Sequence, residues 1–132
     1  MAEARQAAIT ALLVAQDAFK DVQGRTHVYG IFDTLSAERF PITLTFRVFC
    51  RIQGEGTHTV YVKIVDSLDE KLVETAPMPC EVSPTKGHDL FLTFGLVFKA
   101  LGKYRVEAFL DGVKELETPL MLRETKAVDE GS

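Results

Sequence analysis

The chain contains no tryptophan and only two cysteines among its 132 residues. Without a tryptophan framed by a cysteine pair, the core signature of antibody domains is absent. Cys50 and Cys80 form no CxxC motif, so nothing indicates a cysteine-based zinc site. Cys50 falls in the inward register of an expected strand, where a reduced cysteine packs like a small apolar side chain. We expect both thiols to be reduced; one disulfide between two strands is the alternative.

Long apolar runs and basic clusters are also missing. No stretch has the length of a membrane span, and the apolar segment after the N-terminus lacks a signal-peptide cleavage site. The 15 lysines and arginines are spread without a run, and the net charge is -4. This acidic balance argues against a general nucleic-acid binder. We therefore expect a cytoplasmic protein that binds neither membrane nor nucleic acid.

What the sequence does contain is period-two alternation of apolar and polar residues, which is typical of half-buried strands. The alternation is clearest in four segments: Ile42–Ile52, Thr57–Val65, Leu90–Leu101 and Tyr104–Leu110. Turn residues separate the segments, as at Asp111-Gly112, which favours a tight hairpin. No long helical pattern is present. About eight short strands are therefore expected.

Two segments near the N-terminus are less regular. The alanines and leucines of Ile9–Phe19 favour a helix by propensity, but its length and the short polar turn after it suit a first strand, which we expect. In Arg25–Leu35, His27, Tyr29 and Ile31 alternate with residues of the opposite face. Gly30 lies inside this pattern and indicates a bulge or the close approach of another backbone.

Proline marks two further strands as edge strands, because proline cannot donate a hydrogen bond to a neighbouring strand. Lys71–Val82 carries Pro77 and Pro79, and Val113–Arg123 carries Pro119. Together the elements predict an all-β, antiparallel sandwich of immunoglobulin-like character. It would be a single domain over residues 1–132, with a loose leader at 1–8 and a loose tail at 124–132.

Several of these segments resemble one family. Gly24-Arg25, the run Val28–Asp33 and the Phe40-Pro41 entry into a long strand are similar to the bacterial family catalogued as domain of unknown function 6941. The later segments HTVYVKIVD and GKYRVEAFLDG are similar to its remaining strands, so the resemblance covers roughly residues 9–122. It implies a compact immunoglobulin-like sandwich. It implies no activity and no functional residues, and Arg25 stands where the family usually has lysine.

Residues that could carry chemistry show no converging pattern. Three histidines would have to meet to form a metal site, and acidic loops could bind calcium if their aspartates came together. Neither a nucleophile elbow nor a phosphate-binding loop is present. We expect no enzyme, no cofactor and no metal site. The candidates considered were His27, His58 and His88, and the acids Asp17, Asp21, Asp66, Asp69, Glu70, Asp89 and Asp111.

The most informative pattern is a set of apolar residues in the register opposite the core. Strands that share a sheet would bring such residues together as an apolar patch, which often marks a protein contact; the alternative is that another segment of the chain packs over them. We expect a non-enzymatic interaction or scaffolding module that binds a protein partner or itself as a homodimer. The alternative function is a small-ligand or metal-binding sandwich that uses acidic end loops. The possible interface residues are Phe49, Tyr61, Phe91, Val97 and Phe109.

Overall fold

The computed structural model describes residues 6–125 and contains ten strands. They are β1 (Ala7–Lys20), β2 (Thr26–Ile31), β3 (Thr34–Ala37), β4 (Ile42–Gly54), β5 (Gly56–Val65), β6 (Lys71–Glu74), β7 (Met78–Val82), β8 (His88–Phe98), β9 (Gly102–Leu110) and β10 (Val113–Glu124). The expected loose ends at 1–8 and 124–132 lie mostly outside the described residues. Where they overlap with them, Ala7, Ala8 and Glu124 belong to strands.

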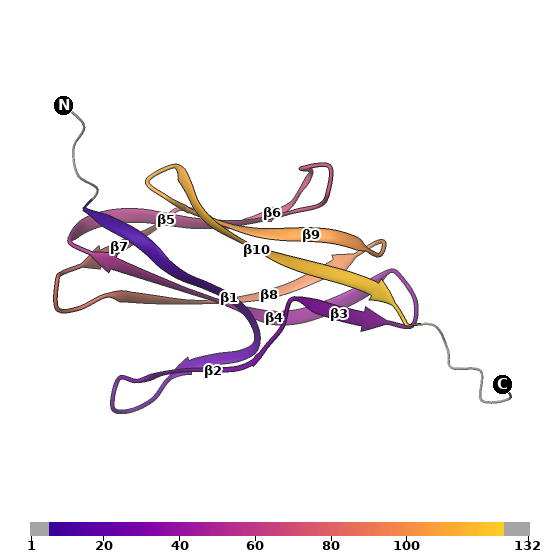
Figure 1. Ribbon diagram of the computed structural model, residues 1–132, viewed down its shortest axis with the longest axis horizontal. Coiled ribbons are helices and arrows are strands. Elements are labelled where there is room, and N and C mark those ends of the chain that lie inside the picture. Colours follow the sequence, from indigo (N-terminus) through magenta and orange to yellow (C-terminus); the bar gives the residue numbers. More distant parts are fainter. Residues whose placement is uncertain (1–5, 126–132) are drawn as a thin grey trace, which may run out of the picture.

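The strands form two sheets that pack face to face (Figure 1). Sheet A has the order β2-β1-β4-β8, and sheet B has the order β3-β10-β9-β5-β6, with β7 also paired to β5. Neighbouring strands are antiparallel except β3 and β10, which run parallel. The all-β sandwich expected from the sequence is confirmed. No helix in residues 6–125 has the length and apolar character needed to cross a membrane.

The core lies between the sheets and consists of the inward register that the alternation predicts. Phe46, Val48 and Ile52 of β4 are almost fully buried. So are Val60 and Val62 of β5. Rings surround Phe46: its centroid lies 5.7 Å from that of Phe94, 6.4 Å from Phe98 and 6.5 Å from Phe32. Both cysteines are free and buried in this core. Burial raises the pKa of the Cys50 thiol to about 12, so it is an inert core residue.

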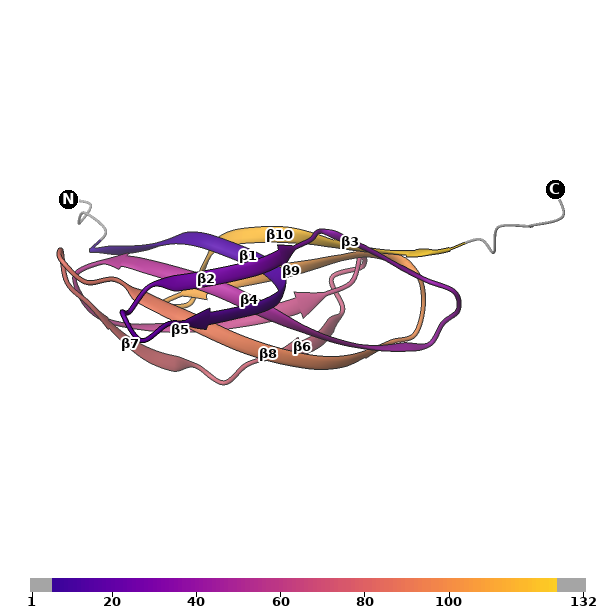
Figure 2. The ribbon, with the colours of Figure 1, turned by 90° about the horizontal axis from the view of Figure 1, so that it is seen from below.

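β1 is a strand, as expected, and its two halves pair with different strands of sheet A. Its first half, Ala7–Ala15, pairs with β4. Its second half, Ala15–Lys20, pairs with β2 instead. Figure 1 shows β1 turning back on itself near its middle, and Figure 2 shows β1 and β2 as a hairpin lying against sheet A. Gly30 makes a close approach, but to a side chain rather than to the other backbone that the sequence indicated: a Cβ at Gly30 would lie 2.9 Å from Gln16 Cβ.

One of the two expected edge segments lies at an edge and the other does not. The segment Lys71–Val82 is at the edge of sheet B, as expected, but it forms two strands, β6 and β7, separated near Pro77. β10 is not an edge strand, because β9 lies on one side of it and β3 on the other. Pro119 is tolerated there because β3 pairs with β10 from Met121 onward, beyond the proline. The edges of sheet A are β2 and β8, and β8 contains no proline.

Candidate functional site

An aromatic cluster lies on the β1–β2 hairpin. Phe19 on β1 stands opposite His27 on β2, and Tyr29 follows two residues later on the same face. The ring centroids of Phe19 lie 5.2 Å from His27 and 5.6 Å from Tyr29, with small interplanar angles that mark stacking. Phe19 is 42% exposed and Tyr29 is 52% exposed. We call Phe19, His27 and Tyr29 the aromatic surface.

Asp21 fixes the turn beside the aromatic surface. Its Oδ2 accepts a hydrogen bond from His27 Nε2 at 2.7 Å, and its Oδ1 accepts from the backbone N–H groups of Gln23 and Arg25 at 2.9 Å each. These donors, the His27 side chain first among them, hold the pKa of the Asp21 carboxyl far below its usual range. The turn and the His27 ring are therefore held in one arrangement, which presents the rings to solvent.

The hairpin is attached to the outer face of sheet A by polar contacts. Asp89 on β8 accepts two hydrogen bonds from Arg51 on β4, at 2.8 and 3.0 Å, and a third from Thr26 at the start of β2. The Arg51 guanidinium lowers the pKa of the Asp89 carboxyl. Further along, Arg47 Nε lies 3.8 Å from Asp17 Oδ1. Thus both strands of the hairpin contact residues that point outward from sheet A.

The structure does not bring the five predicted interface residues together. Phe49, Phe91 and Val97 lie on the outer face of sheet A, whereas Tyr61 and Phe109 lie on the outer face of sheet B. Tyr61 and Phe109 stack with their centroids 4.6 Å apart, and Lys63 Nζ lies 5.2 Å from the Phe109 centroid. The expected single patch is therefore two separate groups on opposite faces.

Phe49 requires a correction of its own, because its side chain is not at the surface. It is 3% exposed, although its register points it away from the core. Its ring packs 5.5 Å from Phe91, and Arg51 lies over it. The contacts of Asp17 with Arg47 and of Thr26 with Asp89 place the hairpin across this part of the sheet. Phe49 is thus the core residue of a second layer, between sheet A and the hairpin.

The three histidines lie apart and have separate roles. His27 belongs to the aromatic surface, and His88 begins β8. On β5, His58 Nδ1 lies 2.6 Å from Asp111 Oδ2, and its Nε2 lies 2.8 Å from the carbonyl oxygen of Glu55. Within the part of the chain described by the structure, no three His, Cys, Asp or Glu side chains lie close enough together to hold a metal ion.

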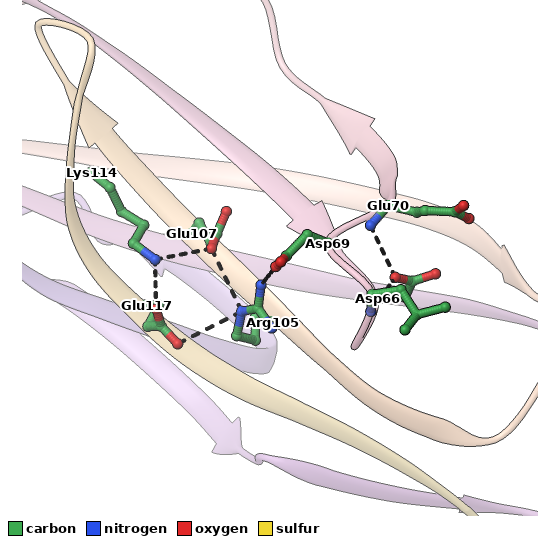
Figure 3. Close-up of polar contacts among 8 residues, drawn as sticks. Asp66, Asp69, Glu70, Arg105, Glu107, Lys114 and Glu117 are labelled. Carbon is green, nitrogen blue, oxygen red and sulfur yellow. Dashed lines mark hydrogen bonds and ion pairs between the residues drawn. The ribbon is translucent and has the colours of Figure 1, made fainter.

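The acidic loop of the calcium hypothesis is used by the fold itself. Asp66 Oδ1 accepts hydrogen bonds from the backbone N–H groups of Leu68 and Glu70, at 2.8 and 3.0 Å, and so closes the turn after β5. Asp69 forms an ion pair with Arg105 on β9. Figure 3 shows both contacts side by side on the outer side of sheet B. These oxygens bind backbone and guanidinium groups rather than converging on a cation.

An ionic network covers the outer face of sheet B (Figure 3). Arg105 Nε lies 3.6 Å from Glu107 and 3.8 Å from Glu117. Lys114 bridges the same two carboxylates at 3.1 and 2.7 Å. Glu107 is buried, and these cations compensate its charge. The network explains how an acid is tolerated in the middle of β9.

His58 leads to a prediction about pH. Both of its ring nitrogens face acceptors, and the Asp111 carboxylate chiefly raises the pKa of His58 above the ordinary 6.5. The stabilisation is therefore complete below the unfolded-state pKa and is lost as the pH rises through the raised folded-state pKa. We expect Asp111→Asn to lower the free energy of unfolding more at about pH 5.5 than at about pH 9, by up to about 1 kcal/mol.

Urea unfolding of wild type and Asp111→Asn across this pH range would measure the difference. Asparagine still suits the positive φ of 51° at position 111 and retains an oxygen for the Thr59 N–H. Glu74→Gln, a charge-neutralising change on β6, is the control, and its effect should not follow the titration of His58. A penalty for Asp111→Asn that grows above pH 8 would contradict the assignment.

Comparisons with known proteins add to this description. The described residues define a two-sheet β-sandwich with a hairpin packed on one face. Residues 10–123 match the model of a family of unknown function (DUF6941), so the chain belongs to that family. This confirms the resemblance drawn from the segments between Gly24 and Gly112. No curated protein matches the chain.

The matching solved structures include two at low sequence identity. One is the Pseudomonas fluorescens alkylpurine DNA glycosylase AlkC bound to DNA containing an abasic site analog, with a TM-score of 0.56 and 10% identity. The match covers 89% of this chain and 30% of the glycosylase. The other is a CARDB domain from Pyrococcus furiosus in complex with di-metal ions, with a TM-score of 0.43, 14% identity and 87% and 94% coverage of the two chains. At these identities the likeness to the glycosylase shows the fold alone.

Sequence reasoning missed Phe19 and recovered part of the aromatic surface. The alternation in Arg25–Leu35 put His27 and Tyr29 on one face, which is correct. Phe19 could not be added, because only the pairing of β1 with β2 places it opposite His27. The one feature of the hairpin that the sequence did indicate was Gly30, whose close approach to Gln16 marks where the two strands of the hairpin come together.

Proposed function

We propose that this protein is a non-enzymatic protein-interaction module and that the aromatic surface is where it contacts its partner. The observation that carries the proposal is the exposure of two stacked rings, Phe19 and Tyr29. They lie on a hairpin that is attached to sheet A by the hydrogen bond from Thr26 to Asp89. Aromatic side chains contribute strongly to protein interfaces because they bury a large area with little loss of side-chain entropy.

Preorganisation supports the same reading. The turn after β1 is tied by Asp21, and His27 completes the stack from within the hairpin. A surface that is already ordered loses little conformational entropy when a partner binds. Elsewhere, side chains of types that could act in catalysis are hydrogen-bonded to neighbouring side chains: His58 to Asp111, and Asp89 to Arg51. These contacts favour a binding role over a catalytic one.

The proposal predicts that Phe19→Ser combined with Tyr29→Ser abolishes binding of a partner without changing the fold. The measurement is affinity capture from the native host with wild type, this double variant and Leu101→Ser as baits. Leu101 is an exposed apolar residue far from the hairpin in sequence and serves as the matched control. A partner that binds wild type and Leu101→Ser should be retained at least about tenfold less by the double variant.

Isothermal titration with the purified partner would then give the loss of affinity directly. Circular dichroism and thermal melts of the three baits must agree for the comparison to hold. A partner that binds all three baits equally would contradict the assignment of the aromatic surface. A wild-type bait that captures no protein at all would contradict the proposed function as a whole.

A further inference from the structure

β8 is an edge strand without the usual protection. It pairs with β4 along all eleven of its residues, from His88 opposite Ile52 to Phe98 opposite Ile42. Within residues 6–125, no strand pairs with its other edge, and no backbone hydrogen bond from another segment reaches it. Natural sheets protect such edges with lysine, proline, bulges or very short strands. The sequence of β8, HDLFLTFGLVF, has no lysine, arginine or proline, and its pairing with β4 shows no register shift.

The other edges among the described strands are protected. β6 has only four residues and is charged at both ends, by Lys71 and Glu74. β7 carries Pro79, β3 has four residues, and β2 is interrupted by Gly30 at a φ of 64°. β8 is therefore exceptional within the described fold. A long, regular, apolar edge is what strand addition requires.

The side of the sandwich next to β8 is also open. A groove of about 430 Å³ lies between β8 and the β6 region, lined by Leu72, Leu96 and Val97 among others. At the other end of β8 a second groove, of about 650 Å³, runs between His88-Asp89 and β7. The inward side chains Leu90, Leu92 and Leu96 are only half-buried as a result. An added strand would complete their burial.

We propose that a second copy of this chain occupies the edge, with β8 pairing antiparallel to β8 of the partner copy about a two-fold axis at Phe94. In this register the outward residues meet as Phe91 with Val97, Thr93 with Gly95, and Asp89 with Lys99. The inward residues meet as Leu90 with Phe98, Leu92 with Leu96, and Phe94 with itself. Apolar residues face apolar residues at every inward pair, and the single lysine next to the strand faces an acid.

Neighbouring registers match less well. A shift of the axis to Thr93 would place Asp89 opposite Val97 and His88 opposite Phe98. A shift to Gly95 would place Lys99 opposite Phe91. In the proposed register, Lys99 adds a cation beside Asp89, whose oxygens already accept from Arg51 and Thr26. The pairing would join the two copies of sheet A into one continuous sheet, and it uses neither the aromatic surface nor the partner that binds there.

The first test is the oligomeric state of the full chain by sedimentation equilibrium. We expect wild type to dimerise and Val97→Lys to raise the dimer dissociation constant at least about tenfold, because a lysine would lie opposite the apolar Phe91 of the other copy. Val97 is 57% exposed, so the monomer should fold normally, as a thermal melt can verify. Val113→Lys is the matched control: Val113 is 53% exposed on β10 and should leave the dimer unchanged.

The second test fixes the register by cross-linking. In a mixture of Thr93→Cys and Gly95→Cys, the two new thiols would lie opposite each other, about 4.5–5.5 Å apart at Cα, within reach of a disulfide. Val97→Cys alone should not cross-link, because its two copies would be about 20 Å apart. A monomeric wild type, including one that carries another protein on β8, overturns the proposal. So does a dimer that Val97→Lys leaves intact or that cross-links through Val97→Cys.

Discussion

Replacing Phe49 with alanine is expected to lower the free energy of unfolding by about 3–5 kcal/mol, the range for a fully buried phenylalanine. Phe49 is 3% exposed and packs against Phe91 between sheet A and the β1–β2 hairpin. The alanine variant would leave a cavity between the hairpin and the strands beneath it. The hairpin should therefore open locally as well, because local unfolding follows the loss of buried contacts.

Urea unfolding and limited trypsin digestion would measure both effects. We expect faster cleavage after Lys20 and Arg25, which lie at the tip of the hairpin. Phe109→Ala is the control: Phe109 also points away from the core but is half-buried, so its loss should cost no more than about 2 kcal/mol. Equal costs for the two variants, or unchanged cleavage after Phe49→Ala, would contradict the assignment of Phe49 to a second core.

Gly54→Ala should be at least as damaging, at about 3 kcal/mol or more. Gly54 has a φ of 138°, a region that side chains rarely adopt, and it ends β4 beside the start of β1. A Cβ there would lie 2.1 Å from the backbone oxygen of Gln6 and 2.5 Å from Ala7 Cα. These are backbone atoms, so they move only if the start of β1 separates from β4.

The control for backbone strain alone is Gly112→Ala. Gly112 has a φ of 83°, but a Cβ there would meet nothing within 4 Å. It should cost about 1–2 kcal/mol, the penalty for a side chain in the left-handed region. Thermal melts of both variants, with amide hydrogen exchange over Ala7–Ile9, would separate strain from steric conflict. If Gly54→Ala costs no more than Gly112→Ala, the close approach of β1 does not hold.

The elements that sequence reasoning predicted best are those whose pattern is local. Period-two alternation identified β4, β5 and β9, and the Asp111-Gly112 turn appears with both residues at positive φ. Such signals depend on a residue and its near neighbours, so one sequence is enough to read them. The same is true of Gly30, whose lack of a side chain permits the approach of Gln16.

What sequence reasoning missed depends on which strands become neighbours. Proline suggested that β10 is an edge strand, but Pro119 sits just before the stretch that pairs with β3. Likewise, the partner of β1 changes from β4 to β2 at Ala15, and nothing in the local sequence marks that change. The outward register of Phe49 was therefore correct, but no local pattern could show that the hairpin covers it. The aromatic surface and the open edge of β8 likewise depend on which strands pair.

The parallel pairing of β3 with β10 has a consequence for how the chain folds. β3 (Thr34–Ala37) pairs with Met121–Glu124, the end of β10, which is the last strand that the structure describes. On a ribosome, β3 leaves the exit tunnel long before the strand that completes it. Contacts between segments so distant in sequence slow folding, because the entropy of closing the loop is lost before the contact forms. Sheet B should therefore close late, after the local β9–β10 hairpin has formed.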